Sequence, residues 1–248
     1  MTLVSIITPV FNNESTIATC LQSLYQQTYP NIEHIILDNC STDGSLSIIE
    51  QHSFHRRLII SEKDNGLYDA INKGIRLSSG SIIGILHADD FYRHAQVIEK
   101  VITLFHQEYQ GVYANLYYVN KNNPQQIVRK WKAGKYHLNS FLYGWMPPHP
   151  TCFVTKKVYD TYGLYRTDLG SAADYEWLLR VMYKYKVTFE YLDDYMVVMR
   201  TGGISNQSLK SRIQAHINDH KAWTVNRLNP LFFTLYLKPL RKILQFIR

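Results

Sequence analysis

Short apolar runs alternate with amphipathic segments along residues 1–105. The runs predict strands, and the segments between them, in which apolar residues recur every three or four positions, predict helices. The predicted strands are residues 3–9, 33–38, 58–60 and 81–86, and the predicted helices are residues 14–27, 45–52 and 67–77. Strands separated by helices of this length predict an α/β fold with a parallel sheet and right-handed crossovers. Because the strands are almost continuously apolar, we expect helices on both faces of the sheet.

The pattern changes after Tyr109. Two strands in mixed or antiparallel pairing, two helices and two further strands are predicted, at residues 112–119 and 126–131, 156–162 and 174–185, and 187–192 and 195–200. No segment rich in Pro, Gly or Ser separates this part of the chain from the first part. A fused second domain is therefore not expected.

The last twenty residues are predicted to form an amphipathic helix. Asn229 would be its N-cap, Pro230 would occupy the first helical position, and Pro239 should kink it. At about 100° per residue, one side of this helix is apolar and the other is basic. The apolar side carries Phe232, Phe233, Tyr236, Leu240, Ile243, Leu244 and Ile247, and the basic side carries Lys238, Arg241, Lys242 and Arg248.

The net charge of the chain lies in its C-terminal segment. Residues 209–248 contain eight basic residues and one acidic residue, which gives the whole net charge of +7 and leaves residues 1–208 neutral. A basic amphipathic helix lies in a membrane interface or packs on a partner, and the alternative is a helix packed on its own protein. We favour an anionic membrane surface, because the excess charge is concentrated here.

The chain also favours a cytoplasmic protein. No run of apolar residues reaches the length of about 18 that a membrane-spanning helix needs, and the N-terminus has no signal-peptide pattern. Cys20, Cys40 and Cys152 show neither metal-binding nor disulfide spacing. A reducing compartment is therefore expected.

The run His87-Ala88-Asp89-Asp90 directly follows the predicted strand at residues 81–86. Adjacent carboxylates and an imidazole at this position suit Mg²⁺ or Mn²⁺ that bridges phosphate oxygens. In open α/β sheets, ligands bind outside the carboxyl ends of the strands. The alternative is a simple turn, in which Asp is common.

Three further polar loops follow predicted strands, at residues 8–14, 38–45 and 64–74. Asp38 could accept hydrogen bonds from a base N–H or a ribose hydroxyl. Asp69 and Lys73 share a helix face and could equally form a surface ion pair. The chain has no GxGxxG and no Walker-A loop, which disfavours dinucleotide-binding and P-loop proteins. It also lacks a glycine-rich loop that ends in a basic residue, which counts against a sugar-nucleotide pyrophosphorylase.

Together these motifs resemble family-2 glycosyltransferases of the GT-A fold. The resemblance over residues 3–105 rests on the order and spacing of VSIITPVFN at 4–12, DNCSTDG at 38–44, EKDNGLYDAINKG at 62–74 and HADD at 87–90. Looser matches at 149–153, 173–180 and 202–205 look like the acceptor-side half of the same group. The form GLYDAINKG is similar to bacterial surface-polysaccharide transferases.

The resemblance implies a mostly parallel, Rossmann-like central sheet flanked by helices. It divides the chain into a GT-A domain at residues 1–208 and the basic helical tail at 209–248. Within the domain, residues 1–105 would bind the nucleotide-sugar and residues 106–208 the acceptor.

The resemblance also implies roles for single residues. The nucleotide-sugar would contact Thr8, Pro9, Val10, Glu14, Asp38, Asp69, Lys73 and Asp89. The ion, Mg²⁺ or Mn²⁺, would lie at Asp89, Asp90 and His87. The family often has Asp where this chain has His87, which leaves open which of these residues binds the ion directly.

On the acceptor side, the resemblance implies that Asp174 is the general base, with His149 and Glu176 beside the acceptor. The alternative for Asp174 is a helix N-cap. Ala173 departs from the family, which often has Glu before the base.

The chemistry that these residues imply is consistent. A divalent cation would neutralise the nucleoside diphosphate leaving group. A carboxylate would take the proton of the acceptor hydroxyl on the opposite face of an oxocarbenium-like state.

We therefore expect an inverting, metal-dependent glycosyltransferase at the inner face of a bacterial cell membrane. The donor would be a UDP-hexose or UDP-N-acetylhexosamine and the acceptor a polyprenyl-linked glycan, with no nucleic-acid partner. The alternatives are a nucleotidyltransferase, which would release pyrophosphate, and a non-catalytic binder of sugar nucleotides.

Overall fold

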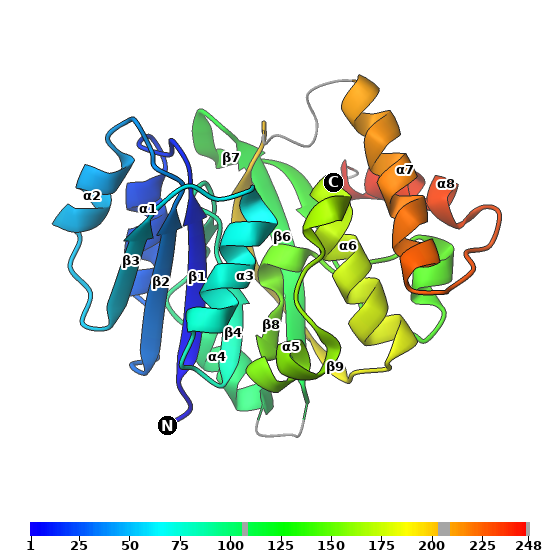
Figure 1. Cartoon of the computed structure of the whole chain (residues 1–248), viewed down its shortest axis with the longest axis horizontal. Coiled ribbons are helices and arrows are strands. Elements are labelled where there is room, and N and C mark those ends of the chain that lie inside the picture. Colours follow the sequence, from blue (N-terminus) through cyan, green and yellow to red (C-terminus); the bar gives the residue numbers. More distant parts are fainter. Residues whose placement is uncertain (106–108, 203–208, 247–248) are drawn as a thin grey trace.

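The computed structural model describes residues 1–105, 109–202 and 209–246. Its core is one nine-stranded sheet with the order β3-β2-β1-β4-β8-β6-β9-β5, in which β7 also pairs with β6 (Figure 1). The first four strands along the chain run parallel to one another, as predicted. They are β1 (Val4–Val10), β2 (Ile32–Asp38), β3 (Arg57–Ser61) and β4 (Ile82–Ile85).

Helices cover both faces of this sheet, which confirms the expectation from the apolar strands. Successive strand residues point to opposite faces, so Ile6 packs with Ile17 on one face while Ile7 packs with Ile71 on the other. The first face carries α1 (Ile17–Tyr25), α2 (Ser45–Gln51) and α4 (Val97–Phe105). The second face carries α3 (Leu67–Leu77), α5 (Lys156–Tyr162) and α6 (Ala173–Leu178).

The sheet becomes mixed beyond β4. Its remaining strands are β5 (Phe91–Tyr92), β6 (Gly111–Asn120), β7 (Asn123–Trp131), β8 (Phe153–Thr155) and β9 (Phe189–Arg200). Antiparallel pairs join β4 to β8, β8 to β6, β6 to β7 and β9 to β5, whereas β6 and β9 are parallel.

The prediction of two separate strands at 187–192 and 195–200 is wrong, because β9 is continuous. Leu192 pairs with Ala114 and Tyr195 with Asn115, which leaves Asp193 and Asp194 as extra residues in a bulge. The Asn115 side-chain amide donates a hydrogen bond to Asp193 at 2.9 Å. A polar pair inside an apolar run therefore marks a bulge here and not a strand end.

The helical segments of the second half are less regular. Residues 174–185 were expected to form one helix, but α6 continues as a π-helical segment, η4 (Leu179–Lys184). Short 3-10 turns connect the other elements: η1 (Ser140–Tyr143), η2 (His149–Thr151) and η3 (Thr167–Ala172).

The C-terminal segment forms α7 (Leu209–Val225), α8 (Thr234–Ile243) and the turn η6 (Leu244–Phe246). Pro239 lies inside α8 as predicted, but the helix does not start after Asn229. It starts at Thr234, whose hydroxyl donates a hydrogen bond to the Leu142 carbonyl and accepts one from the Leu231 N–H. This tertiary contact fixes the start of the helix, in place of the local cap that the sequence suggested.

Both helices pack on the part of the molecule formed by residues 106–208 (Figure 1). Trp223 of α7 is fully buried and donates its indole N–H to the Tyr175 hydroxyl at 2.9 Å. Lys238 of α8 lies over the Tyr175 ring and pairs with Asp219 at 2.7 Å. Within the described ranges, no helix has the length and apolar character that crossing a membrane requires.

Candidate active site

The polar loops after β1, β2 and β3 meet at the carboxyl edge of the sheet. The backbone N–H of Asn12 donates to the Ser41 hydroxyl at 3.0 Å, and the N–H of Gly44 donates to Glu14 at 2.7 Å. The N–H of Asp64 donates to the Asn39 side chain at 2.9 Å. These bonds join three loops that are far apart in the sequence, as the order of strands and motifs predicted.

Two residues of these loops have an unusual backbone conformation. Asn12 and Cys40 lie in the left-handed region, with φ of 52° and 50°. Asn tolerates this region, whereas a residue such as Cys adopts it at a cost that the surrounding contacts must offset. The hydrogen bonds between the loops supply those contacts.

Asp38 is held rigidly at the end of β2. Its buried carboxylate accepts hydrogen bonds from the N–H and hydroxyl of Ser41 and from the Ser61 hydroxyl, the last at 2.6 Å. The orientation of this carboxylate is therefore fixed by the protein itself.

The other predicted donor residues lie around this edge. Thr8, Pro9 and Val10 form the buried end of β1. The Asp69 carboxylate accepts the Asn65 N–H at 3.0 Å, and Lys73 pairs with Glu62. The ion pair considered for Asp69 and Lys73 is thus replaced by a pair between Lys73 and Glu62, the first residue after β3.

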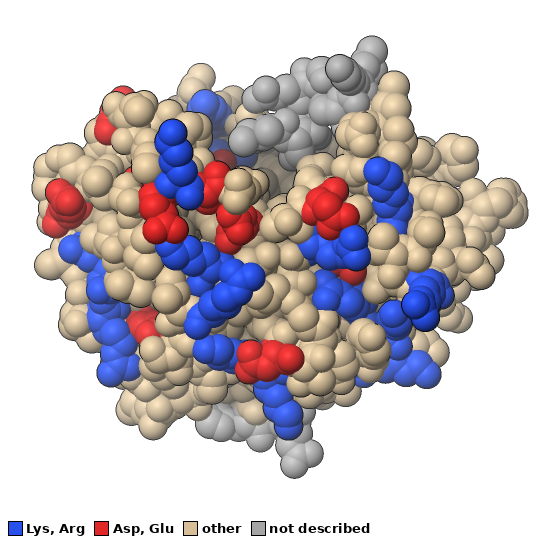
Figure 2. All heavy atoms as spheres, viewed as in Figure 1, with Lys and Arg blue, Asp and Glu red and all other residues tan. Residues whose placement is uncertain are grey.

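Acidic side chains gather near the top of the face shown in Figure 2, above the carboxyl ends of β1 and β2 and the start of α3. Basic side chains lie directly beside them. The surface at this edge of the sheet therefore carries both signs of charge.

Asp90 differs from every other carboxylate at this edge. It is fully buried, and neither of its oxygens has a hydrogen-bond partner among the described residues. Burial raises the pKa of Asp90 well above its usual range, the charge of Asp89 raises it further, and Arg200 opposes both. Arg200 also donates to the Asp89 carbonyl, which fixes the turn. A buried carboxylate without donors is costly unless a cation neutralises it.

Asp89 and Asp90 alone do not complete the coordination of a divalent cation, which would need further oxygen atoms from a bound nucleotide. Within the described part of the chain, no group of three or more His, Cys, Asp or Glu side chains could hold a metal ion. Asp89 and the unpartnered Asp90 would supply hard oxygen ligands, and phosphate oxygens of a nucleotide would complete the set.

The two histidines near this site are held in apolar surroundings. The His87 and His149 rings lie 6.4 Å apart, and burial lowers the pKa of His87. Burial, followed by the neighbouring His87, lowers the pKa of His149 to about 3, and its Nε2 lies 2.8 Å from the Tyr165 hydroxyl. A neutral His149 is therefore anchored against Tyr165 in the second half of the chain.

Asp174 lies in the first turn of α6. The helix begins at Ala173 with Ala172 as N-cap, so the cap position considered for Asp174 belongs to another residue. One carboxylate oxygen accepts the Tyr175 N–H at 2.7 Å. After burial, the charge of Asp174 is the next cause that raises the pKa values of Tyr68 and Cys152. Asp174 thus faces side chains from both halves.

Glu176 is engaged inside the protein. It is buried, pairs with Arg180 at 2.9 Å and accepts a hydrogen bond at 3.0 Å from Asn226, which directly follows α7. Its predicted place beside the acceptor is not tested by these contacts, which join α6 to α7. The residues Gly203, Ile204 and Ser205 of the last predicted motif lie outside the described residues, as do Ile247 and Arg248 of the tail.

Tyr118 was not found by sequence reasoning. Burial raises its pKa, Arg129 opposes this, and the charges of Asp90 and Asp174 both raise it further. The Arg129 guanidinium lies 4.4 Å from the centre of the Tyr118 ring and donates to Gln245 of η6. No motif marks Tyr118, because its position depends on the pairing of β6 with β7 and β9.

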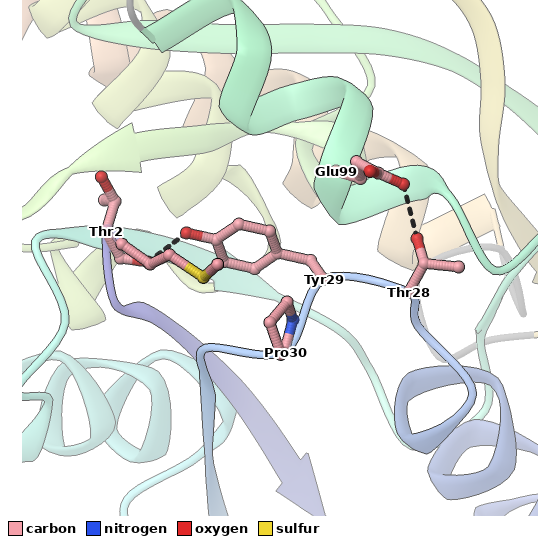
Figure 3. A pocket seen from close by; sticks show the side chains of 6 residues that line it. Thr2, Thr28, Tyr29, Pro30 and Glu99 are labelled. Atoms are coloured by element: carbon pink, nitrogen blue, oxygen red, sulfur yellow. Dashed lines mark hydrogen bonds between the residues drawn. The ribbon is translucent and has the colours of Figure 1, made fainter.

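A further surface hollow lies elsewhere. It has a volume of about 590 Å³ and is lined by residues that precede β1 and β2 and by Glu99 of α4 (Figure 3). Tyr29 donates to the Thr2 carbonyl, and Thr28 donates to Glu99 at 2.7 Å. This hollow is at the amino ends of the parallel strands, opposite the edge where the loops meet. It offers one carboxylate and no cation, so we assign it no chemistry.

The fold and the loops at its carboxyl edge define a glycosyltransferase of the GT-A fold. Among solved structures, S. aureus TarS 1-349 in complex with UDP-GlcNAc has a TM-score of 0.67 and 19% sequence identity, over 95% of this chain and 69% of that chain. The mannosyltransferase PcManGT from Pyrobaculum calidifontis, in complex with GDP-Man and Mn²⁺, has a TM-score of 0.67 and 18% identity, over 96% and 69% of the two chains. The longer TarS chain is covered over 41% of its length. At these identities the likeness shows the fold.

The chain belongs to glycosyl transferase family 2, whose profile matches residues 5–163. It is 29% identical over 210 residues to a PGL/p-HBAD biosynthesis glycosyltransferase of Mycobacterium bovis, which covers 82% of this chain and 78% of the relative. It is 28% identical over 183 residues to chondroitin synthase of Escherichia coli, covering 72% of this chain and 26% of that protein. The expected family and fold are thus confirmed, and the protein is a family 2 glycosyltransferase.

Proposed function

We propose that this protein transfers a hexose or N-acetylhexosamine from a UDP-sugar to a lipid-linked glycan, with inversion and with Mg²⁺ or Mn²⁺. The observation that carries this proposal is the buried, unpartnered Asp90 beside Asp89 at the edge where the nucleotide loops meet. Such a carboxylate suits a cation that also binds a diphosphate. The structural neighbours with UDP-GlcNAc or with GDP-Man and Mn²⁺ support a nucleotide-sugar donor and a metal ion.

The loops after β1, β2 and β3 would hold the nucleotide. Asp38 is oriented by three donor groups and would present its remaining lone pairs to the base or ribose. Thr8, Pro9, Val10 and Glu14 would line the base pocket, and Asp69 and Lys73 would close it from α3. The cation, when bound at Asp89 and Asp90, would stabilise the charge of the leaving diphosphate.

Asp174 would remove the proton from the acceptor hydroxyl. The charges of Asp90 and Asp174 both raise the pKa of Tyr118, so the two carboxylates lie near the same side chain. A base on the face of the sugar opposite the leaving group would give a single displacement and therefore inversion. The raised pKa keeps the Tyr118 hydroxyl protonated at neutral pH, and it would donate a hydrogen bond to one of these carboxylates.

The proposed acceptor is a polyprenyl-linked glycan in bacterial surface-polysaccharide synthesis, used at the inner face of the cell membrane. The names of the two relatives, a PGL/p-HBAD biosynthesis glycosyltransferase and chondroitin synthase, support a role in glycan synthesis. His149 and the residues around Trp145 would form the wall that selects it.

The test uses the full chain with UDP-glucose, UDP-galactose, the two UDP-N-acetylhexosamines and GDP-mannose, each with Mn²⁺ or EDTA. We expect one UDP-sugar to raise the thermal midpoint with Mn²⁺ and to release UDP in the presence of a short prenyl-linked sugar acceptor. NMR coupling constants should show an inverted anomeric centre in the product.

Four outcomes would contradict the proposal. Full activity in EDTA would show that no divalent cation is needed. Retention of the anomeric configuration would exclude a single displacement. Release of pyrophosphate would identify a nucleotidyltransferase. Binding of UDP without turnover of any acceptor would identify a non-catalytic binder.

A further inference from the structure

The two C-terminal helices leave a row of large apolar side chains in solvent. Phe232, Tyr236 and Leu240 are 89%, 65% and 54% exposed, and they follow one another at intervals of four residues along α8 and the turn before it. Side chains at this spacing lie on one side of a helix. The inner side of α8 is made by the buried Leu235 and by Lys238.

The row continues onto α7. Ile213 and Ile217 of α7 are 64% and 44% exposed. His216 lies between them in the sequence, and its ring is 5.6 Å from the Tyr236 ring. We call Ile213, Ile217, Phe232, Tyr236 and Leu240 the α7–α8 apolar face. It lies at the end of the molecule away from β3 and α2 (Figure 1).

This face is not used to hold the protein together. The contacts that attach α7 and α8 to the body come from other sides of the helices, through Trp223, Asn226, Leu235 and Lys238. The sequence placed Lys238 on the basic outer side, yet it turns inward to Asp219 and Tyr175. Internal packing therefore does not explain why these large apolar side chains are present.

The charge around the face is of one sign. The segment 209–248 carries the whole net charge of +7, and its single acidic residue, Asp219, is neutralised by Lys238. Lys221 of α7, Arg227 of the turn that follows it and Arg241 of α8 are exposed. Exposed apolar side chains together with excess cations match the chemistry of an anionic lipid surface, which takes up apolar groups at its boundary and attracts Lys and Arg.

We propose that the α7–α8 apolar face docks the protein on an anionic lipid bilayer. Phe232, Tyr236 and Leu240 enter the boundary between headgroups and acyl chains, and the exposed cations meet the phosphates of the lipids. The surface is separate from Asp90 and Asp174, so its test measures membrane binding and not turnover.

The experiment measures flotation of the full chain with vesicles of phosphatidylcholine, with and without phosphatidylglycerol. Phe232→Ser, Tyr236→Ser and Leu240→Ser are combined in one variant. The matched control combines Leu58→Ser, Leu77→Ser and Tyr185→Ser, which are also exposed but lie elsewhere. A third variant combines Lys221→Gln, Arg227→Gln and Arg241→Gln. Deletion of the helices is avoided, because it would uncover Tyr175 and leave Glu176 without Asn226.

We expect the natural chain and the control to float with vesicles that contain phosphatidylglycerol. The affinity of the face variant for vesicles should be lower by about tenfold or more at every salt concentration. The charge variant should lose the preference for anionic vesicles. No binding by the natural chain, or equal binding by the face variant, would overturn the proposal. A face variant that changes from dimer to monomer with unchanged vesicle binding would make the face a contact between copies of the chain. Failed UDP-sugar turnover would contradict the proposed function and leave this result intact.

Discussion

The loops after β2 and β4 lie at the same edge of the sheet, but they differ in the hydrogen bonds that they give to a buried carboxylate. Asp38, after β2, accepts hydrogen bonds from the N–H and hydroxyl of Ser41 and from the Ser61 hydroxyl. Asp90, after β4, is equally buried and has no hydrogen-bond partner among the described residues. The protein itself supplies hydrogen-bond donors to Asp38, whereas it supplies none to Asp90 among the described residues.

The two carboxylates therefore differ in what the fold controls: the orientation of Asp38 is fixed, and the charge of Asp90 is left without hydrogen-bond donors among the described residues. A carboxylate that accepts several hydrogen bonds is stable as an anion and has a fixed direction, which suits recognition of a base or ribose. A carboxylate buried without donors destabilises the folded chain when it is ionised, and a bound cation relieves that cost. The β2 loop is therefore shaped by the protein alone, whereas under the proposed function a bound cation would complete the β4 loop.

The largest expected effect is at Asp90. Asp90→Asn should lower transfer by about 10³-fold at saturating Mn²⁺, because one ligand of the cation is lost. In EDTA its free energy of unfolding should stay constant or rise, since an amide is not ionised. Asp38→Asn is the matched variant, and we expect its free energy of unfolding to fall by about 1–3 kcal/mol through weakened hydrogen bonds. Urea unfolding and steady-state turnover measure both, and equal destabilisation of the two variants would remove the contrast.

Asp174 should give the next largest effect. Asp174→Asn keeps the size of the side chain and removes its basicity, so turnover should fall by about 10²-fold or more while donor binding changes little. Its control is Glu176→Gln on the same helix, which should lower the free energy of unfolding by about 3 kcal/mol by breaking the buried pair with Arg180. Turnover by the folded Glu176→Gln protein should persist. Near-normal turnover of Asp174→Asn would leave the carboxylate with a structural role only.

A buried histidine beneath the donor loops makes stability depend on pH. Burial, followed by the charge of Arg57, lowers the pKa of His34 to about 3, and its ring nitrogens contact Tyr25 and Thr8. The unfolded chain binds this proton near pH 6.5, so stability is present above about pH 6.5 and is lost as the pH falls toward 3. Between pH 6.5 and 5 the loss should be roughly 2 kcal/mol for this residue. Urea unfolding of His34→Phe, which does not titrate, should lack this part of the slope; an unchanged slope would refute the assignment.

The smallest effect is expected at Tyr118, whose pKa is raised by the charges of both Asp90 and Asp174. Tyr118→Phe would remove the proposed hydrogen bond to a charged group, worth about 1.5 kcal/mol, and should lower kcat about tenfold. The ring that stacks with Arg129 remains. Tyr117→Phe is the control, because Tyr117 occupies the neighbouring position of β6 and stacks on Tyr195 of β9. Equal kcat values for the two variants would exclude a role for the Tyr118 hydroxyl.

Local pattern alone determined much of this protein. The spacing of apolar residues predicted α3 and α5 with the bounds that the structure has, because the apolar face of an amphipathic helix runs along its whole length. The order of strands and polar loops placed Asp38 and Asp89 at one edge of the sheet, because parallel strands all end on the same side. The family and fold followed from these local features.

Tertiary structure decided what depends on residues far apart. Lys238 faces inward because Asp219 and the Tyr175 ring lie beneath it, against the helical pattern. The bulge in β9 depends on its pairing with β6, and the position of Tyr118 depends on the same strand. Above all, the sequence offered Asp90 only as one carboxylate of a pair. That it is buried without a hydrogen-bond donor among the described residues, which is why we propose a cation there, is a property of the packing around it.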